Sequence, residues 1–164
     1  LGHNWNLIMA APVRSFDLYA AKFVVVTKLA LLTHGFVFLL YGFCGKAFAH
    51  LPGWPPAVQM LFLLRGAVGA LAVIAAQLVL SMLIRSFAVP VFLALMGGIV
   101  GMLAGSKGLS LLWPYCLMQA GMNSNRVEDV LSGSYAAFFF SCAVWLAAMF
   151  AAAWVLLEKR DVRG

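Results

Sequence analysis

Apolar residues along the chain gather in four long runs that are separated by short polar or turn-rich segments. The runs cover about 23–43, 62–84, 87–105 and 135–157. A helix needs about 20 apolar residues to cross the hydrocarbon core of a bilayer, and each run is close to that length. The runs do not alternate with a period of two, and they are too long for barrel strands. The pattern predicts an all-α, polytopic transmembrane helix bundle, with 1–164 as a single domain and four visible spans.

Two further segments contain many apolar residues but do not have the pattern of a span. Residues 1–19 mix apolar side chains with Asn, Arg, Ser and Asp, which predicts an N-terminal amphipathic helix on the membrane surface. Residues 109–122 are mostly apolar but too few to cross a bilayer, and they contain Pro114. We expect this second segment to form a short re-entrant or interfacial helix on the external side.

Composition agrees with a membrane protein and excludes several other classes. Hydrophobic residues make up 65% of the chain and charged residues 10%, and the mean hydropathy is +1.00. A soluble domain or a disordered chain needs far more charge than this. Three cysteines, an odd number without CxxC spacing, do not suggest a scaffold built on disulfides.

The net charge of +6 comes from 11 basic against 5 acidic residues. The basic residues are scattered around the ends of the apolar runs, which is typical of topology markers and not of a nucleic-acid-binding stripe. One side of the membrane would carry Arg14, Lys22, Arg85, Lys159, Arg160 and Arg163. The other side would carry Lys46, Lys107, Arg126 and Arg65. Because the first side is richer in basic residues, we expect it to be cytoplasmic, with both ends of the chain on that side.

Small residues in the third span predict close packing of helices. Gly97, Gly101 and Gly105 recur at four-residue spacing, which allows another helix backbone to approach. Packing within one subunit is the preferred interpretation, and a seam between subunits is the alternative.

Several polar side chains fall inside the apolar runs, and His34 and Arg65 are the two that could have a special role. His34 in the first span is more typical of a polar contact within the bundle than of a metal or haem ligand, because the other histidines lie far from it. Arg65 lies near the outer end of the second span, where we expect it to reach the interface in preference to contacting a substrate. No nucleophile–base arrangement, zinc motif or phosphate loop is present in the sequence. We therefore expect no catalytic, cofactor or metal site in this chain, and any energy must come from a partner.

Three stretches of the sequence have the pattern of known motifs. The opening WNLIMAAPVR at 5–14, followed by DLYAAK at 17–22, resembles the cytoplasmic amphipathic helix that precedes the third membrane helix in ABC-2 type transporter permeases. LSMLIRSFAVPV at 80–91 and LWPYCLM at 112–118 are similar to a turn and to the segment before the last helix in the lantibiotic-immunity and bacitracin-resistance branch of that family. The resemblance extends over the whole chain.

The resemblance implies an exporter permease whose ATP and magnesium are bound by a separate cytoplasmic ATP-binding subunit. Within the amphipathic segment, Trp5, Pro12, Arg14 and Asp17 would lie at the surface that couples to that subunit. A second permease copy or a sister permease would complete the transporter. The resemblance also implies six membrane helices, of which this sequence would contain the last four. We therefore expect an N-terminal truncation that lacks the first two helices. Substrates would be peptide antibiotics or other amphipathic compounds, expelled across a bacterial cytoplasmic membrane.

Two alternatives remain open at this point. The chain could be an accessory membrane scaffold or assembly subunit without its own transport pathway, which would bind a partner complex but leave antibiotic tolerance unchanged on deletion. It could also be a haem or quinone membrane subunit that uses His34. A visible absorption spectrum would distinguish the haem version from the others.

Overall fold

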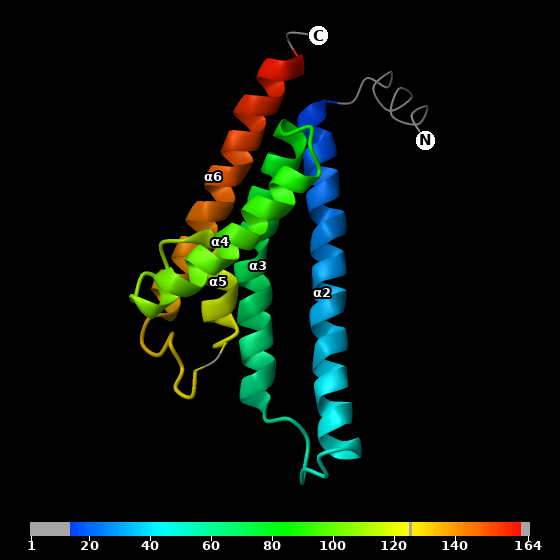
Figure 1. The fold of residues 1–164 in the computed structure, drawn as a ribbon, viewed down its shortest axis with the longest axis vertical. Helices are drawn as coiled ribbons and strands as arrows, with labels where there is room; N and C mark the ends of the chain where they lie inside the picture. Colours follow the sequence, from blue (N-terminus) through cyan, green and yellow to red (C-terminus); the bar gives the residue numbers. More distant parts are fainter. Residues whose placement is uncertain (1–13, 125, 162–164) are drawn as a thin grey trace.

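The computed structural model describes residues 14–124 and 126–161, and it consists of helices joined by short connections (Figure 1). The helices are α2 (Ser15–Ala47), α3 (Ala57–Leu83), α4 (Ala88–Ser106), α5 (Pro114–Gly121) and α6 (Tyr135–Asp161). Within these described ranges no residue is in a strand. Four of the helices, α2, α3, α4 and α6, are long and apolar enough to cross a membrane. The predicted all-α bundle with four candidate spans is confirmed.

The ends of the bundle differ in what they contain. The start of α2, the α3–α4 turn and the end of α6 lie together at one end, which we call the terminal end (Figure 1). The α2–α3 loop, the α4–α5 loop and the link between α5 and α6 lie toward the opposite end, which we call the loop end. The segments expected on one side of the membrane therefore share one end of the molecule. The assignment of that side to the cytoplasm stays a prediction.

α2 begins earlier than the apolar run that predicts it. It starts at Ser15, whereas the run starts near 23, so 15–19 of the expected amphipathic segment forms the first turn of the long helix. No proline interrupts the helix at this point. Phe16 and Tyr19 also pack against Phe150 of α6, and these tertiary contacts stabilise the additional turn.

α3 is the central helix of the bundle, in contact with α2, α5 and α6. Its buried positions are mostly small, and they include Gly66, Gly69, Ala72, Ala75 and Ala76. Small side chains allow neighbouring backbones to approach, which provides the close van der Waals contacts on which helix association in a bilayer depends. The larger core side chains, Leu117, Leu131 and Phe138, come from the helices and the link that surround α3.

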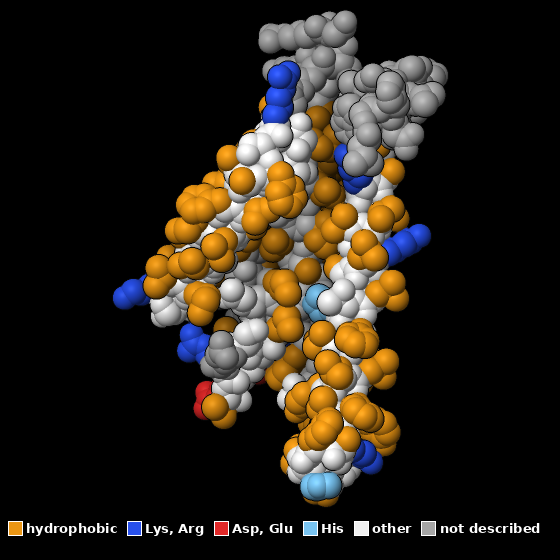
Figure 2. Space-filling view, turned by 45° about the vertical axis from the view of Figure 1, so that its right-hand side comes forward, with side chains coloured by type: hydrophobic (Ala, Val, Ile, Leu, Met, Phe, Trp, Pro, Cys, Tyr) orange, Lys and Arg blue, Asp and Glu red, His pale blue; other side chains and the backbone are white. Residues whose placement is uncertain are grey.

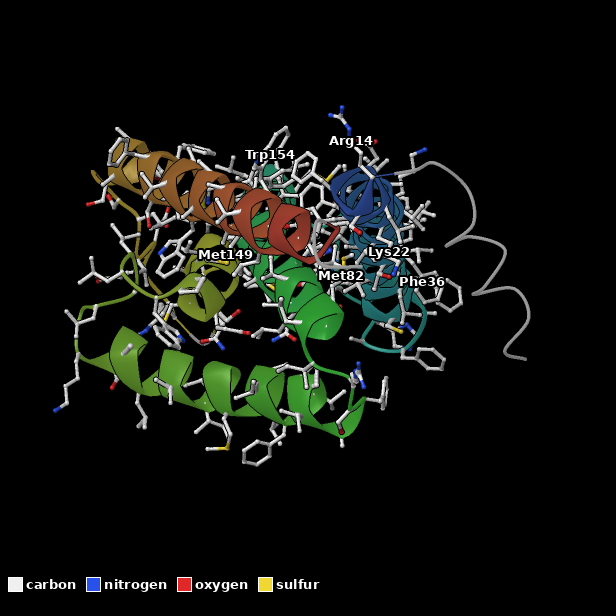
Figure 3. The ribbon with its side chains drawn as sticks, turned by 90° about the horizontal axis from the view of Figure 1, so that it is seen from above. Arg14, Lys22, Phe36, Met82, Met149 and Trp154 are labelled. Carbon is white, nitrogen blue, oxygen red and sulfur yellow. The ribbon has the colours of Figure 1, made fainter. Side chains whose placement is uncertain are left out.

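α2 and α4 are covered on one face only. Seen from above, α4 lies apart from the α2–α3–α6 group, and Phe36 of α2 points outward (Figure 3). Apolar side chains cover the outer surface of both helices in the space-filling view (Figure 2). Leu32, Phe36 and Leu39 of α2 are 64–70% exposed. These faces are suited to lipid or to further apolar helices and not to water.

An aromatic cluster joins α2 to α6 at the terminal end. We define it as Phe16, Tyr19, Phe23, Phe150 and Trp154, whose ring centroids lie 4.9–6.3 Å apart in the pairs that touch. Most of the pairs are edge to face, an arrangement that aromatic rings favour. The Tyr19 hydroxyl donates a hydrogen bond to the Ala75 carbonyl at 3.2 Å, so the cluster also attaches α2 to α3.

Candidate functional site

A buried arginine organises the loop end of the bundle. Arg65 of α3 is only 3% exposed and forms an ion pair with Asp129 of the α5–α6 link. The pair is bidentate: Nη1 donates to Oδ2 at 2.9 Å and Nη2 to Oδ1 at 3.0 Å. The Arg65 Nε–H donates to the Gly121 carbonyl at 3.3 Å. The expectation that Arg65 reaches the interface is wrong, because its charge is satisfied inside the protein by a carboxylate from a distant part of the chain.

Asp129 has several donors besides Arg65. The Tyr135 hydroxyl donates to Oδ2 at 2.8 Å, and the Leu131 backbone N–H donates to Oδ1 at 3.1 Å. The hydrogen bonds from Arg65, followed by those from Tyr135 and Leu131, lower the pKa of the Asp129 carboxyl to about 2. Asp129 is therefore ionised throughout the physiological pH range. We call Arg65, Asp129 and Tyr135 the polar clasp.

Glycines allow α5 to pack directly on α3 beside the polar clasp. A Cβ at Gly69 would lie 2.5 Å from the backbone carbonyl carbon of Leu117, and one at Gly121 would lie 2.6 Å from the carbonyl oxygen of Arg65. Both distances are too short for a side chain, and the opposing atoms are backbone. The sequence alone did not predict a packing role for these glycines. The available signal was the placement of Gly66 and Gly69 within one turn of an arginine inside an apolar run.

The glycine stripe of α4 faces the same short helix. A Cβ at Gly97 would lie 2.8 Å from the Tyr115 ring, and one at Gly101 would lie 3.4 Å from the Cys116 nitrogen. The helix that approaches these glycines is therefore α5. A Cβ at Gly105 would have no atom within 4 Å among the described residues, so no close approach in the described structure requires a glycine at this third position.

Polar contacts fix α5 between α3 and α4. The Gln77 amide of α3 donates to the Tyr115 hydroxyl, and the Trp113 indole N–H donates to the Gly97 carbonyl at 3.0 Å. The thiol of Cys116 donates to the Gly101 carbonyl. α4 packs mainly on α5 and touches α3 at few positions, so α5 acts as a wedge that holds α4 away from the bundle.

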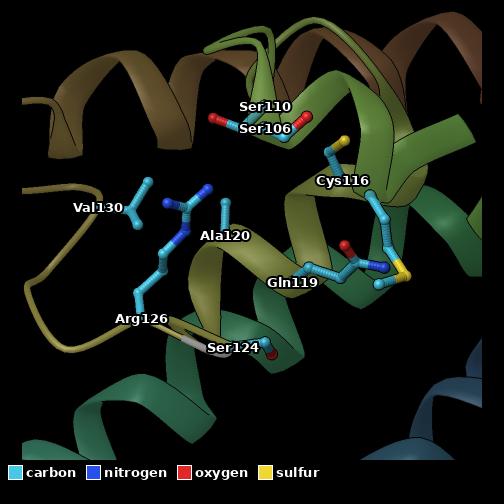
Figure 4. Close-up of a pocket in the computed structure, with 10 residues that line it drawn as sticks. Ser106, Ser110, Cys116, Gln119, Ala120, Ser124, Arg126 and Val130 are labelled. Atoms are coloured by element: carbon cyan, nitrogen blue, oxygen red, sulfur yellow. The ribbon is translucent and has the colours of Figure 1, made fainter.

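This wedge separates two cavities. The loop-end cavity, of about 410 Å³, is bordered by the end of α4, by α5 and by the link, and its polar side chains are Ser106, Ser110, Gln119, Ser124 and Arg126 (Figure 4). The terminal-end cavity, of about 580 Å³, lies between α3 and α4 and is mostly apolar, with Gln77, Ser81, Arg85 and Ser86 as its polar residues. Along α4, Gly97 lies between the residues that border the two cavities. Both volumes are in the range of small-molecule sites.

The predicted coupling residues lie at the terminal end or beyond the described ranges. Arg14 and Asp17 are exposed, and Arg14 precedes the first residue of α2 (Figure 3). Asp17 lies in the first turn of α2, where a negative charge interacts favourably with the helix dipole. Trp5 and Pro12 fall outside the described residues. The structure therefore places Arg14 and Asp17 together at the exposed start of α2.

His34 and the cysteines show no arrangement for ligating a metal. His34 Nδ1 lies 2.8 Å from the Ala30 carbonyl of its own helix, and its buried Nε2 has no partner among the described residues. Cys44, Cys116 and Cys142 are free thiols. In the described part of the chain, no three His, Cys, Asp or Glu side chains come together as metal ligands would.

Comparison with known proteins identifies one family. The family model described as ABC-2 family transporter protein matches residues 2–101, which is more than half of the chain. The matched range includes α2, α3 and most of α4. No curated protein and no solved structure matches the chain.

Proposed function

The chain belongs to the ABC-2 family of transporter proteins, and we propose that it is the membrane permease of an exporter that expels amphipathic compounds, including peptide antibiotics. Membership makes it a multi-pass membrane component of an ABC transporter that works with an ATP-binding subunit. The family match carries the assignment to a transporter permease, and export and the substrate class are the proposed extensions of it. Nucleotide and magnesium would bind to the partner subunit and not to this chain.

The terminal end is the proposed docking surface for the ATP-binding subunit. It presents Arg14, Asp17 and Arg85 as exposed side chains, and Trp5 and Pro12 precede them in the sequence. A force applied there reaches α6 and α3 through the aromatic cluster, because Tyr19 contacts both helices. Movement of the start of α2 would therefore shift the two helices that carry the core of the bundle.

The terminal-end cavity supports the choice of amphipathic substrates. It lies between α3 and α4, its walls are largely apolar, and Gln77, Ser81 and Arg85 supply its polar contacts. α4 touches α3 at few positions, so a change in the angle of α4 alters this cavity without breaking the α3–α5 contact. Substrate would leave the membrane as α4 moves between two arrangements. Export at a bacterial cytoplasmic membrane would protect the cell from the compound, as in self-immunity.

A second permease copy or a sister permease would complete the transporter. The outer faces of α2 and α4 are apolar over most of their length, and either could contact a second permease or further helices of a longer protein. The proposal predicts two permease units per complex with two ATP-binding subunits. Cross-linking of the purified complex, followed by mass determination, would count them.

The coupling surface is tested by reversing its charges. We would express the full protein with its ATP-binding partner and introduce Arg14→Glu together with Asp17→Arg, with Lys107→Glu at the loop end as the matched control. We expect the double variant to lose co-purification of the ATPase, or to lose substrate-stimulated ATP hydrolysis and antibiotic tolerance, while the control keeps them. If the double variant retains all three properties, the coupling assignment fails. If the partner binds but deletion leaves tolerance unchanged, the chain is an accessory scaffold.

A further inference from the structure

We propose that the loop-end cavity binds the phosphate-bearing headgroup of an anionic amphipathic molecule and that Arg126 recognises its charge. Binding at this cavity requires neither the ATPase nor the coupling surface, and it is the same for either direction of transport. It rests on the side chains that border the cavity, on their hydrogen bonds and on the apolar surface next to it.

Arg126 provides a positive charge at the edge of the cavity. Its guanidinium points into the cavity, toward the side that carries Ser106 and Ser110 (Figure 4). Among the described residues, no carboxylate borders the cavity, and none forms an ion pair with Arg126. Asp129, three residues along the link, is already bound by Arg65 and Tyr135. The planar guanidinium can bind two oxygens of one phosphate group at the same time.

The other polar groups of the cavity add hydrogen-bond donors. The Gln119 amide and the hydroxyls of Ser110 and Ser124 make no side-chain hydrogen bond in the described part of the structure, although they border the cavity. The Ser106 hydroxyl already donates to the Leu103 carbonyl at 2.7 Å. Three uncommitted donor groups beside an arginine, with no acidic side chain among the described residues that border the cavity, favour an anion over a cation.

The apolar surroundings favour an anion that carries a hydrocarbon tail. Met102 and Val130 border the cavity and are 59% and 43% exposed. Met102 continues along the outer face of α4 into Leu95 and Ile99, which are also exposed. At about 410 Å³ the cavity is larger than a phosphate group alone requires, and a tail could follow the outer face of α4. An anionic headgroup in the cavity would contact its polar lining, and a hydrocarbon tail would cover the exposed apolar face of α4.

Gly105 offers a steric test that leaves the helix packing intact. It borders the cavity, and a Cβ there would meet no atom within 4 Å in the described structure. Gly105→Leu should therefore fill the cavity without displacing α5. Arg126→Gln removes the charge from an exposed side chain, and Arg126→Lys keeps the charge but loses the planar pair of donors.

The experiment measures binding to the full protein in nanodiscs made of phosphatidylcholine. The probes are short-chain phosphatidylglycerol, short-chain phosphatidylcholine and inorganic phosphate, each titrated and followed by native mass spectrometry. We expect phosphatidylglycerol to bind at least about tenfold more tightly than the other two. Arg126→Gln should weaken the binding of phosphatidylglycerol by about tenfold or more, because it removes a charge-assisted hydrogen bond. Gly105→Leu should weaken it by a similar factor, because the new side chain occupies the cavity. Arg126→Lys should fall between the wild type and Arg126→Gln.

The matched control is Lys107→Gln, which removes an exposed charge at the same end but not in the cavity. Binding should be unchanged in this variant. An equal loss in Lys107→Gln and Arg126→Gln would mean that general surface charge attracts the lipid, and the proposal would be wrong. Equal affinity for the two lipids, or for inorganic phosphate and phosphatidylglycerol, would also overturn it. The thermal stability of each variant without added probe identifies any loss that is due to misfolding.

Discussion

The two ends of the bundle are held together by different chemistry. At the loop end, the polar clasp joins α3 to the link through a bidentate ion pair with donor–acceptor distances of 2.9 and 3.0 Å. At the terminal end, the aromatic cluster joins α2 to α6 through ring contacts with centroids 4.9–6.3 Å apart. A bidentate ion pair fixes distance and angle together, whereas edge-to-face rings keep much of their contact over centroid separations of about 4.5–7 Å.

This difference suggests which end can move. If α2 and α6 slide past each other by a fraction of a turn, the rings of the aromatic cluster can follow with little loss of contact. A similar shift between α3 and the link would separate Arg65 from Asp129 and leave charges unpaired in a buried position. We therefore expect the terminal end to adapt to a docked partner while the loop end keeps its geometry. Substitutions at each end can test this expectation.

The largest expected effect comes from removing the charge of the polar clasp. Arg65→Met leaves the Asp129 carboxylate without its main partner, and breaking a buried pair costs about 3–5 kcal/mol. Because the Asp129 side chain is 23% exposed, water can hydrate the unpaired carboxylate and offset part of this cost. We expect the free energy of unfolding to fall by about 2–4 kcal/mol. The measurement is unfolding of the purified protein in mixed micelles by titration with SDS. Asp129→Asn should cost at least as much as Arg65→Met, because it leaves the Arg65 guanidinium, which is only 3% exposed, without a counterion.

A pair of glycine substitutions should separate close packing from simple helix propensity. Gly69→Ala places a methyl group 2.5 Å from the backbone of Leu117, and overpacking of this kind costs about 1–3 kcal/mol. Gly98 lies in α4, which is also a candidate span, and a Cβ at this position would have no atom within 4 Å in the described structure. Gly98→Ala should therefore leave stability unchanged or raise it slightly. Equal stability of the two variants in the same unfolding assay would argue against the direct contact between α5 and α3.

Loss of one hydroxyl from the aromatic cluster should have a smaller effect. Tyr19→Phe removes the hydrogen bond to the Ala75 carbonyl but keeps the ring contacts, and a single neutral hydrogen bond contributes about 0.5–1.5 kcal/mol. We expect a fall in thermal stability of a few degrees, with the helical circular dichroism spectrum unchanged. A loss as large as that of Arg65→Met would show that the terminal end is held as rigidly as the loop end.

The smallest effect concerns pH. The folded-state pKa of Asp129 is lowered from 3.8 to about 2, so its stabilising contribution is complete above the unfolded value and is lost as the pH falls through the folded one. Between pH 5 and 8 the polar clasp should therefore add no pH dependence to stability. Below about pH 4 the difference in stability between the wild type and Asp129→Asn should shrink. A difference that changes steadily between pH 5 and 8 would contradict the lowered pKa.

The apolar pattern predicted the four candidate spans because their length and composition depend on the bilayer alone. The start of α2 could not be predicted, since it depends on contacts of Phe16 and Tyr19 with another helix. The partner of Arg65 was also hidden, because Asp129 is 64 positions away in a polar link. The stripe at Gly97, Gly101 and Gly105 indicated close packing, but only a structure shows that α5 covers the first two and leaves the third open.

The sequence separation of the polar clasp has a consequence for biosynthesis. Ribosomes make the chain from its N-terminus, so α3 is complete when Asp129, 64 positions further on, has not yet been added. The Arg65 guanidinium then enters the membrane region without its carboxylate and without the Gly121 carbonyl. Because an unpaired charge is costly inside a bilayer, we expect it to stay near the headgroups until α5 and the link have been translated and have folded over it. The burial of one side chain thus becomes a late step in membrane insertion, and a chain that stops before the link would keep an uncompensated charge at the surface of α3.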